Sequence, residues 1–106
     1  MQSHKPRKAF GQNFLCDQGI IQRIVQVIDP KPGDNLVEIG PGQGALTWPV
    51  LQEAGVLTAI EIDRDLIQLL RKAAATHEGR FHLHEGDALT VDLSTVAQGT
   101  GPLRLI

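Results

Sequence analysis

The feature that most constrains the fold of this chain is a short apolar stretch that leads directly into a run of glycines. Residues 35–39 read Asn-Leu-Val-Glu-Ile, and residues 40–44 read Gly-Pro-Gly-Gln-Gly. A short apolar run that ends at glycine is typical of a buried strand, and glycine permits a tight turn from a strand into a helix. The segment therefore predicts a strand–loop–helix unit whose loop lets a ligand approach the backbone closely.

Strand and helix patterns alternate along the rest of the chain. Further strands are predicted at 57–62 and 81–85, and residues 103–106 resemble the start of a fourth. Helices are predicted over Ile20–Ile28, from Ala45 or Leu46 onward, and after Asp63. Asp17 and Asp63 are the expected N-caps, and the last helix is expected to turn inward Leu66, Leu69, Leu70 and Ala73. This alternation predicts an α/β fold with a parallel sheet, right-handed crossovers and flanking helices.

Three polar features lie at or just beyond the predicted strand ends. The glycine loop follows the first strand, Glu61 ends the second, and Asp87 follows the third after Gly86. Ligands of open parallel sheets bind outside the carboxyl ends of the strands, so these features indicate one small-molecule site. A carboxylate such as Glu61 has acceptor oxygens for both hydroxyls of a ribose, and Asp87 could accept the exocyclic amine of adenine. If each residue is considered alone, Glu61 can also be interpreted as a surface acid at a strand end, and Asp87 as an aspartate of a turn.

The glycine loop fits two classes of adenosine cofactor. Gly40-x-Gly42-x-Gly44 with Glu38 two residues upstream is close to the pattern of S-adenosylmethionine enzymes. Gly40-x-Gly42-x-x-Ala45, with Glu61 about 20 residues further on, also satisfies the dinucleotide fingerprint. A carboxylate beside the glycines suits a cationic, amino-bearing ligand better than a pyrophosphate, so Glu38 favours the methyl donor.

Composition excludes several function classes. No apolar run approaches the roughly 18 residues that a membrane span requires, and the single Cys16 fits a reducing cytoplasm. His82 and His84 share one face of a strand, but a third ligand for a metal is not apparent, so no metal site is expected. The net charge is −2, yet residues 1–23 carry four basic side chains and one acidic one. Such an arm suits either phosphate contact or simple solvation.

The segment Lys8-Ala9-Phe10-Gly11-Gln12-Asn13-Phe14-Leu15 resembles the opening motif of the rRNA adenine N6,N6-dimethyltransferase family. Members of that family continue with an apolar helix, Glu-Ile-Gly-Pro-Gly-x-Gly, an acid after the second strand, and Gly-Asp-Ala after the third. This chain has all four in the same order, and the last two are Glu61 and Gly86-Asp87-Ala88. The resemblance covers nearly the whole chain, and its combination of motifs is highly specific.

The resemblance implies a Rossmann-like, S-adenosylmethionine-dependent methyltransferase fold. It implies methyl transfer to N6 of two adjacent adenines near the 3′ end of small-subunit rRNA, in a cytoplasmic enzyme that acts on a pre-ribosomal particle. By position in the family, the cofactor-binding residues are Gln12, Asn13, Leu15, Gly40, Gly42, Glu61 and Asp87. Gly40 is expected to meet the methionine part through its backbone, Glu61 the ribose and Asp87 the adenine.

The resemblance also implies a division of the chain. Residues 1–16 are expected to form a basic arm that contacts the cofactor, and residues 17–106 the N-terminal part of a methyltransferase domain. The family carries an Asn-Leu/Ile-Pro-Tyr/Phe motif after the fourth strand, which holds and stacks on the flipped target base. This chain contains no tyrosine and ends at Ile106, about where that motif is expected to begin. We therefore expect no catalytic residue in the chain, a truncated sheet, no C-terminal helical domain, and no activity of this chain alone.

Three other functions stay open on the sequence. Macrolide-resistance methylases of large-subunit rRNA share the Gln-Asn-Phe arm and the Glu-Ile-Gly-Pro-Gly loop, although Phe10-Gly11 leans toward the small-subunit enzyme. A nicotinamide-binding oxidoreductase domain would use the dinucleotide fingerprint. A non-catalytic assembly or transcription factor derived from the same family is the third. The sequence does not indicate an oligomeric state.

Overall fold

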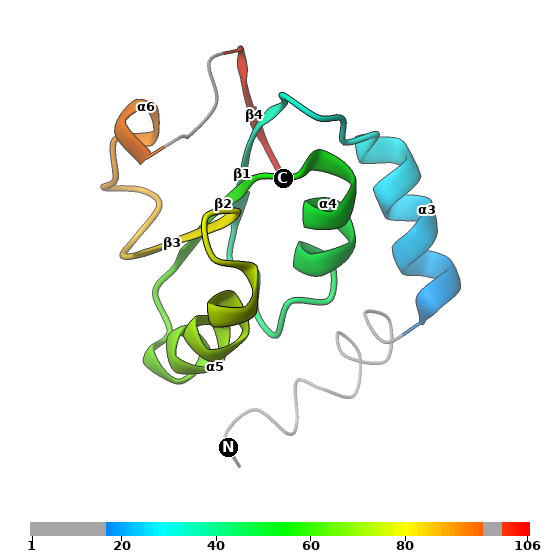
Figure 1. Ribbon diagram of the computed structural model, residues 1–106. Coiled ribbons are helices and arrows are strands. Elements are labelled where there is room, and N and C mark those ends of the chain that lie inside the picture. Colours follow the sequence, from blue (N-terminus) through cyan, green and yellow to red (C-terminus); the bar gives the residue numbers. More distant parts are fainter. Residues whose placement is uncertain (1–16, 97–100) are drawn as a thin grey trace.

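Four parallel strands form the sheet of this protein, whose computed structural model describes residues 17–96 and 101–106. The strands lie in the order β3-β2-β1-β4 (Figure 1). Their bounds are β1 Asn35–Ile39, β2 Leu57–Glu61, β3 Phe81–Glu85 and β4 Leu103–Leu105. Val37 pairs with Thr58 on one side and with Leu105 on the other, so β1 is one of the two inner strands of this sheet. The predicted parallel sheet is confirmed.

The predicted helices before β1, after β1 and after β2 are confirmed, and a short helix that was not predicted follows β3. They are α3 Gln18–Ile28, α4 Thr47–Ala54, α5 Arg64–Ala74, which continues into the 3₁₀ turn η2 Ala75–His77, and α6 Leu93–Val96. Asp17 caps α3 by accepting a hydrogen bond of 3.1 Å from the Ile20 N–H. Asp63 caps α5 by accepting from the N–H groups of Asp65 and Leu66 at 2.9 and 3.3 Å. Both predicted N-caps are confirmed. Within the described residues, no helix is long and apolar enough to cross a membrane.

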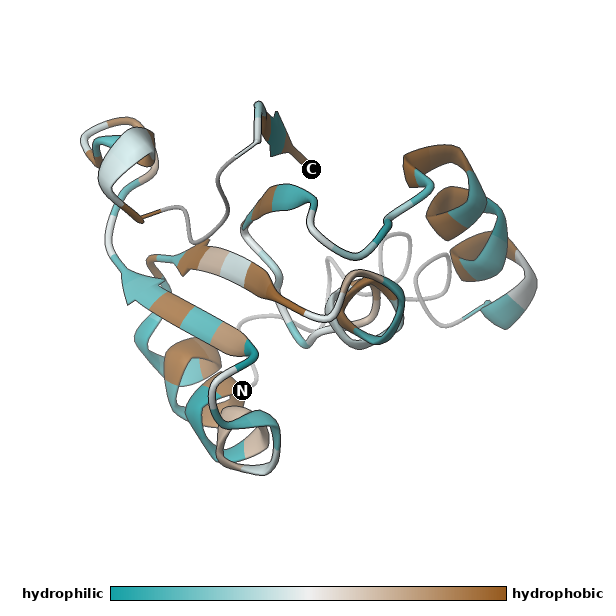
Figure 2. Ribbon diagram, turned by 45° about the horizontal axis from the view of Figure 1, so that its top comes forward, coloured by the Kyte–Doolittle hydropathy of each residue, from teal (hydrophilic) through white to brown (hydrophobic). Residues whose placement is uncertain are grey.

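Alternate residues of each strand face opposite layers, which gives the sheet two apolar clusters. On one face, Leu36 and Leu57 pack with residues of α3, α4 and α5 in the larger cluster. On the other face, Val37 and Ile60 pack against Val96 of α6. Figure 2 shows the alternation as brown and teal bands along β3. The larger cluster holds the helices that precede and follow β1, and it thereby fixes where the glycine loop lies.

Two details of the predicted elements are wrong. β2 ends at Glu61, so Ile62 lies outside the strand and is 65% exposed. On α5 the buried residues are Ile67 and Leu70, whereas Leu69 is 54% exposed. The apolar residues of this helix form a wide band along one side, so its sequence is compatible with two overlapping inward-facing stripes. Packing against β2 and β3 selects the stripe that contains Ile67.

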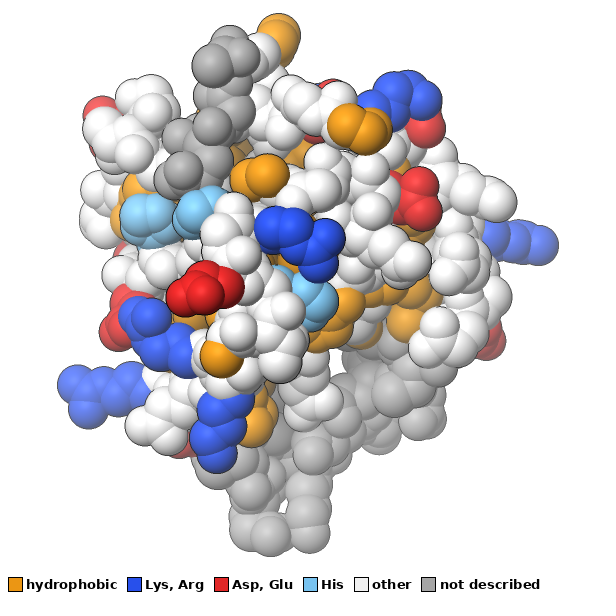
Figure 3. All heavy atoms as spheres, in the orientation of Figure 1, with side chains coloured by type: hydrophobic (Ala, Val, Ile, Leu, Met, Phe, Trp, Pro, Cys, Tyr) orange, Lys and Arg blue, Asp and Glu red, His pale blue; other side chains and the backbone are white. Residues whose placement is uncertain are grey.

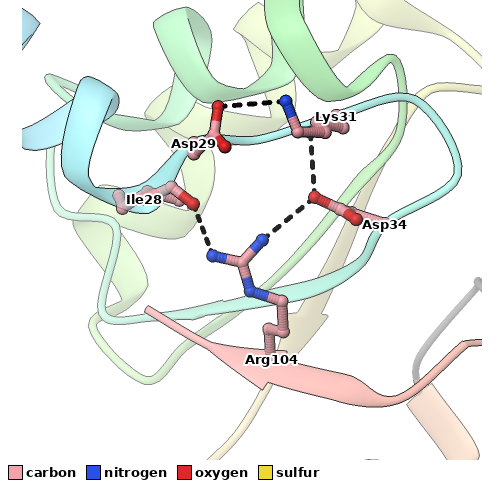
Figure 4. Close-up of polar contacts among 5 residues, drawn as sticks. All are labelled: Ile28, Asp29, Lys31, Asp34 and Arg104. Carbon is pink, nitrogen blue, oxygen red and sulfur yellow. Dashed lines mark hydrogen bonds and ion pairs between the residues drawn. The ribbon is translucent and has the colours of Figure 1, made fainter.

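A polar cluster at the opposite end of the sheet from the glycine loop ties β4 to the connection between α3 and β1. The guanidinium of Arg104 donates to the Asp34 carboxylate at 3.0 Å and to the Ile28 carbonyl (Figure 4). Asp34 also accepts from the Lys31 N–H at 2.8 Å, and Lys31 pairs with Asp29 at 3.3 Å. One arginine of β4 is therefore joined to two points that lie 70 and 76 residues earlier in the chain.

Candidate functional site

The loops that follow β1, β2 and β3 leave the sheet side by side. The Gly40 N–H donates to the carbonyl of Ile60 at 2.9 Å, and the Gly86 N–H donates to the carbonyl of Glu61 at 2.9 Å. The three strands are parallel neighbours, so their carboxyl ends meet at one edge. The predicted convergence of the glycine loop, Glu61 and the Gly86-Asp87 segment at this edge is confirmed.

The glycine loop has a backbone that other residues would adopt only with strain. Gly40 and Gly42 have φ angles of 68° and 63°, in the left-handed region that L side chains disfavour. A Cβ at either position would meet no atom of residues 17–96 or 101–106 within 4 Å, so these residues leave the space over the loop open. Packing also restricts position 44 to glycine, because a Cβ there would clash with the indole of Trp48. The loop thus presents bare backbone to an open space at the strand ends.

Glu61 links this loop to the second strand. Its Oε1 accepts from the Gly42 N–H at 3.2 Å, and its Oε2 accepts from the N–H groups of Ile62 and Asp63 at 3.0 and 3.1 Å. The side chain is almost fully buried. A carboxylate offers about four lone-pair sites, so three backbone donors orient Glu61 and still leave capacity for a ligand hydroxyl.

A second carboxylate, that of Glu38, belongs to β1 and precedes the glycine loop in the chain. Glu38 is 5% exposed, and its Oε1 accepts a hydrogen bond of 2.6 Å from the hydroxyl of Thr47, which is 0% exposed. Burial raises the pKa of Glu38 from its ordinary value of 4.5 to about 7. The Thr47 hydrogen bond opposes this rise and the negative charge of Glu61 adds to it. Glu38 thus holds a proton that is easily lost near neutral pH.

Asp87 organises the turn after β3. Its carboxylate accepts from the Leu89 N–H at 2.9 Å, and its carbonyl accepts from the N–H groups of Thr90 and Val91 at 2.9 and 3.1 Å. This is the turn role that aspartate commonly takes. Its predicted contact with adenine stays a prediction.

Some predicted features fall outside the described part of the chain. Gln12, Asn13, Leu15 and Cys16, together with the basic arm over 1–16, lie outside the described residues. The face in Figure 3 carries basic and acidic side chains intermixed. Among the described residues, no group of three histidine, cysteine or acidic side chains is placed to hold a metal ion.

Sequence reasoning missed two residues of this edge. Ile62 is a large apolar side chain exposed directly after Glu61, and the signal for it was an isoleucine between the two acids Glu61 and Asp63. Thr47 gave no signal, because its partner Glu38 lies nine residues away and the two meet only when α4 packs on β1.

A groove elsewhere on the surface lies between α3, α4 and η2. Its floor includes Trp48, which stacks on His77 with ring centroids 5.0 Å apart and meets the edge of Phe81 at 5.0 Å. Arg80 also contacts the His77 ring at 3.0 Å. Gly40, Gly42, Glu61 and Asp87 do not line this groove, so it is separate from the strand-end site.

The chain matches one protein family over most of its length. A sequence profile described as Ribosomal RNA adenine dimethylase matches residues 3–101. A ribosomal RNA small subunit methyltransferase A from Methylococcus capsulatus is 55% identical over 96 residues, which are 91% of this chain and 37% of that protein. The chain thus spans well under half the length of this relative.

Solved structures agree with the sequence comparison. The 23S rRNA methyltransferase ErmE is 32% identical, with a TM-score of 0.65 over 72% of this chain and 31% of that chain. An RNA methyltransferase from Salinibacter ruber, solved in complex with S-adenosyl-L-homocysteine, is 25% identical, with a TM-score of 0.64 over 76% of this chain and 54% of that chain. The predicted Rossmann-like methyltransferase fold is confirmed.

Proposed function

The chain belongs to the ribosomal RNA adenine dimethylase family, and from this premise we propose that it is the S-adenosylmethionine-binding part of a small-subunit rRNA adenine N6-dimethyltransferase. The observation that carries the proposal is the meeting of an open glycine loop, Glu61 and Asp87 at one sheet edge. The whole enzyme would transfer two methyl groups to N6 of each of two adjacent adenines near the 3′ end of that rRNA.

Each part of the cofactor has a matching group at this edge. The bare backbone of Gly40 and Gly42 would receive the methionine part, because a side chain there would occupy the open space. Glu61 would accept the ribose hydroxyls with the lone pairs that its three N–H donors leave free. Asp87 would accept the adenine amine. S-adenosyl-L-homocysteine in the Salinibacter ruber structure supports this class of ligand.

Ile62 adds an apolar contact to these polar ones. Ile62 is a large aliphatic side chain that is 65% exposed, directly after the buried Glu61, at the edge where the loops after β1, β2 and β3 meet. A purine ring held between Glu61 and Asp87 would cover Ile62. We therefore assign Ile62 to the adenine-binding part of the site.

The length of the relatives indicates which part of the enzyme this chain would supply. Residues 1–16, with Gln12, Asn13 and Leu15, would form an arm that contacts the cofactor, and residues 17–106 would form the donor side of the methyltransferase domain. The chain spans 37% of the Methylococcus capsulatus relative. Groups that hold the target adenine of the RNA, and the RNA itself, would then belong to the unmatched part of such a protein. The whole protein would act on a pre-ribosomal particle in the cytoplasm.

Small-subunit RNA is favoured over large-subunit RNA by the comparisons. Identity is 55% to a protein named for the small subunit and 32% to the 23S rRNA methyltransferase ErmE. The dinucleotide alternative has less support, because the structural relatives reported above are methyltransferases.

Binding measurements test the donor side. We expect titration calorimetry to show that the chain binds S-adenosyl-L-homocysteine but not NAD. Glu61→Gln should weaken binding about tenfold, because hydrogen bonds to a charged group contribute about 1.5–3 kcal/mol. Glu53→Gln is the control, since Glu53 is exposed on α4. Binding of NAD in preference to S-adenosyl-L-homocysteine would contradict the proposal.

Analysis of cellular RNA tests the acceptor side. Cells that lack the encoding gene should lose N6,N6-dimethyladenine from small-subunit rRNA, which mass spectrometry of the purified RNA measures. Loss from large-subunit rRNA instead would support the macrolide-resistance class, and unchanged modification of both RNAs would refute the assignment to either methyltransferase.

A further inference from the structure

Thr47 lies at the start of α4, but its hydroxyl binds a side chain of the neighbouring strand β1. It is the first residue of α4, and a threonine one position earlier, at the N-cap, would often cap the helix by accepting a hydrogen bond from a backbone N–H. Here Leu46 stands at the N-cap position and no side chain caps the helix. The Thr47 hydroxyl instead donates to the Oε1 of Glu38 at 2.6 Å, and both side chains are buried. The contact therefore serves the carboxylate at the end of β1 rather than the start of α4.

The surroundings of Glu38 make its charge sensitive. From β2, Glu61 faces it as a second acid, and from α4 the neutral hydroxyl of Thr47 faces it. The glycine loop begins two residues after Glu38, and its Gly42 N–H donates to Glu61. Burial and the like charge favour the protonated Glu38, whereas the Thr47 donor favours the ionised form. Among the described residues, the Thr47 hydroxyl is thus the contact that opposes protonation of Glu38.

We propose that Thr47 is a positioning residue for the cofactor, which holds the Glu38 carboxylate in place and makes binding of the amino-bearing methionine part depend on loss of a proton from Glu38. This inference rests on the proposed function. The Thr47 contact uses one carboxylate oxygen, and the second is left for a ligand donor. An ammonium group beside the glycine loop stabilises the ionised acid, so the ligand displaces the proton.

Proton-linked binding has a measurable signature. The pKa of Glu38 is about 7 in the empty protein, so a large part of the molecules carries the proton at neutral pH. Affinity for an amino-bearing ligand should then rise with pH until the acid is fully ionised. Below that point, binding should release a fraction of one proton into the buffer.

Titration calorimetry with S-adenosyl-L-homocysteine tests the proposal on the 106-residue chain. Runs between pH 5.5 and 8.5, in two buffers of different ionisation enthalpy, give both the affinity and the number of protons released. For the wild type we expect the affinity to rise with a midpoint near pH 7 and to level off about one pH unit higher. In Thr47→Val, loss of the donor should move this midpoint upward by about one unit, which corresponds to affinity about fivefold weaker at pH 7. Thr47→Ser should restore the wild-type profile.

Two further variants keep the test decisive. Thr58→Val is the matched control, because Thr58 is also a buried threonine but its hydroxyl donates to the Val96 carbonyl at 3.5 Å. Its profile should keep the wild-type midpoint. If Thr47→Val does not fold, Thr47→Cys retains a small side chain with a weaker donor, and ¹³C NMR titration of the Glu38 carboxyl then measures the same upward shift.

The outcomes separate this inference from the function on which it rests. A midpoint that is unchanged in Thr47→Val and Thr47→Cys overturns the role of Thr47, even if both bind the ligand. Binding that releases no proton in the wild type overturns the proton linkage. Failure of the folded wild type to bind S-adenosyl-L-homocysteine at any pH overturns the proposed function itself.

Discussion

Gly42 combines a left-handed backbone with an open space above it, and these two properties have separable effects. Its φ of 63° would strain any L side chain, and its N–H donates to Glu61 whatever the side chain is. A methyl group at this position would meet no atom of the described part of the chain within 4 Å, so it would project into the space assigned to the cofactor. Stability should therefore report the backbone strain, whereas ligand affinity should report the obstruction.

We expect Gly42→Ala to lower the free energy of unfolding by about 1 kcal/mol and to weaken S-adenosyl-L-homocysteine binding at least tenfold. Gly33→Ala is a matched control, because Gly33 has a φ of 90°, also meets nothing within 4 Å, and precedes β1 at the other end of the sheet. It should lose similar stability and keep its affinity. Urea unfolding and calorimetry measure the two quantities. Equal affinity in both variants would show that the loop does not face the ligand.

Sequence reasoning identified the residues whose role is local and missed those whose role depends on packing. Asp17 and Asp63 were predicted as caps because a cap is decided within four residues. Glu61 was predicted from its place at a strand end. The Glu38–Thr47 contact could not be predicted, because it forms only after α4 packs on β1 and both side chains become buried.

Among the elements, β4 is the shortest strand, and it depends on a side-chain anchor. It has three residues and pairs with β1 over Leu103–Leu105, and each of the three is exposed. Arg104 adds the contacts to Asp34 and to the Ile28 carbonyl that are seen in Figure 4. Because the strand buries little apolar surface, we expect these polar contacts to add measurably to the backbone hydrogen bonds that hold it to β1.

Replacing Arg104 with methionine keeps the apolar stem and removes the donors. We expect Arg104→Met to destabilise the protein by about 1 kcal/mol, as is usual for a partly exposed ion pair with hydrogen bonds, and to speed amide exchange in β4 more than in β2. Arg64→Met, at an exposed position that begins α5, should change neither. The same exchange rates in β4 for both variants would mean that the backbone ladder alone holds the strand.

The elements themselves were predicted well where their pattern is long and poorly where it is short. The strands over 35–39 and 81–85 have the predicted bounds; the first is a largely apolar run that ends at glycine, and the second alternates Phe81 and Leu83 with polar residues and ends before Gly86. The four-residue α6 was not predicted. It begins after Asp92, which accepts from the Ser94 N–H at 3.0 Å, and it buries only Val96, so its sequence carries almost no periodic signal.

At the scale of the whole molecule, one buried acid should govern much of the pH dependence of stability. The pKa of Glu38 is about 7 in the folded protein and 4.5 in its ordinary state, chiefly because of burial. An acid whose pKa is raised by folding contributes stability that is fully present below about pH 4.5 and is lost as the pH rises through about 7. The core is therefore least stable at the pH where the site is best prepared for a cationic ligand.

Glu38→Gln removes this titration while keeping a similar shape and a hydrogen-bond acceptor for Thr47. Between pH 5 and pH 8, we expect the wild type to lose on the order of 2 kcal/mol more unfolding free energy than the variant loses. The other titratable groups are common to both proteins, so their contributions cancel in the difference. Urea unfolding at the two pH values measures it. Parallel loss of stability in the two proteins would mean that Glu38 stays ionised in the folded core, and the proton-linked binding inferred for the glycine loop would then lose its source.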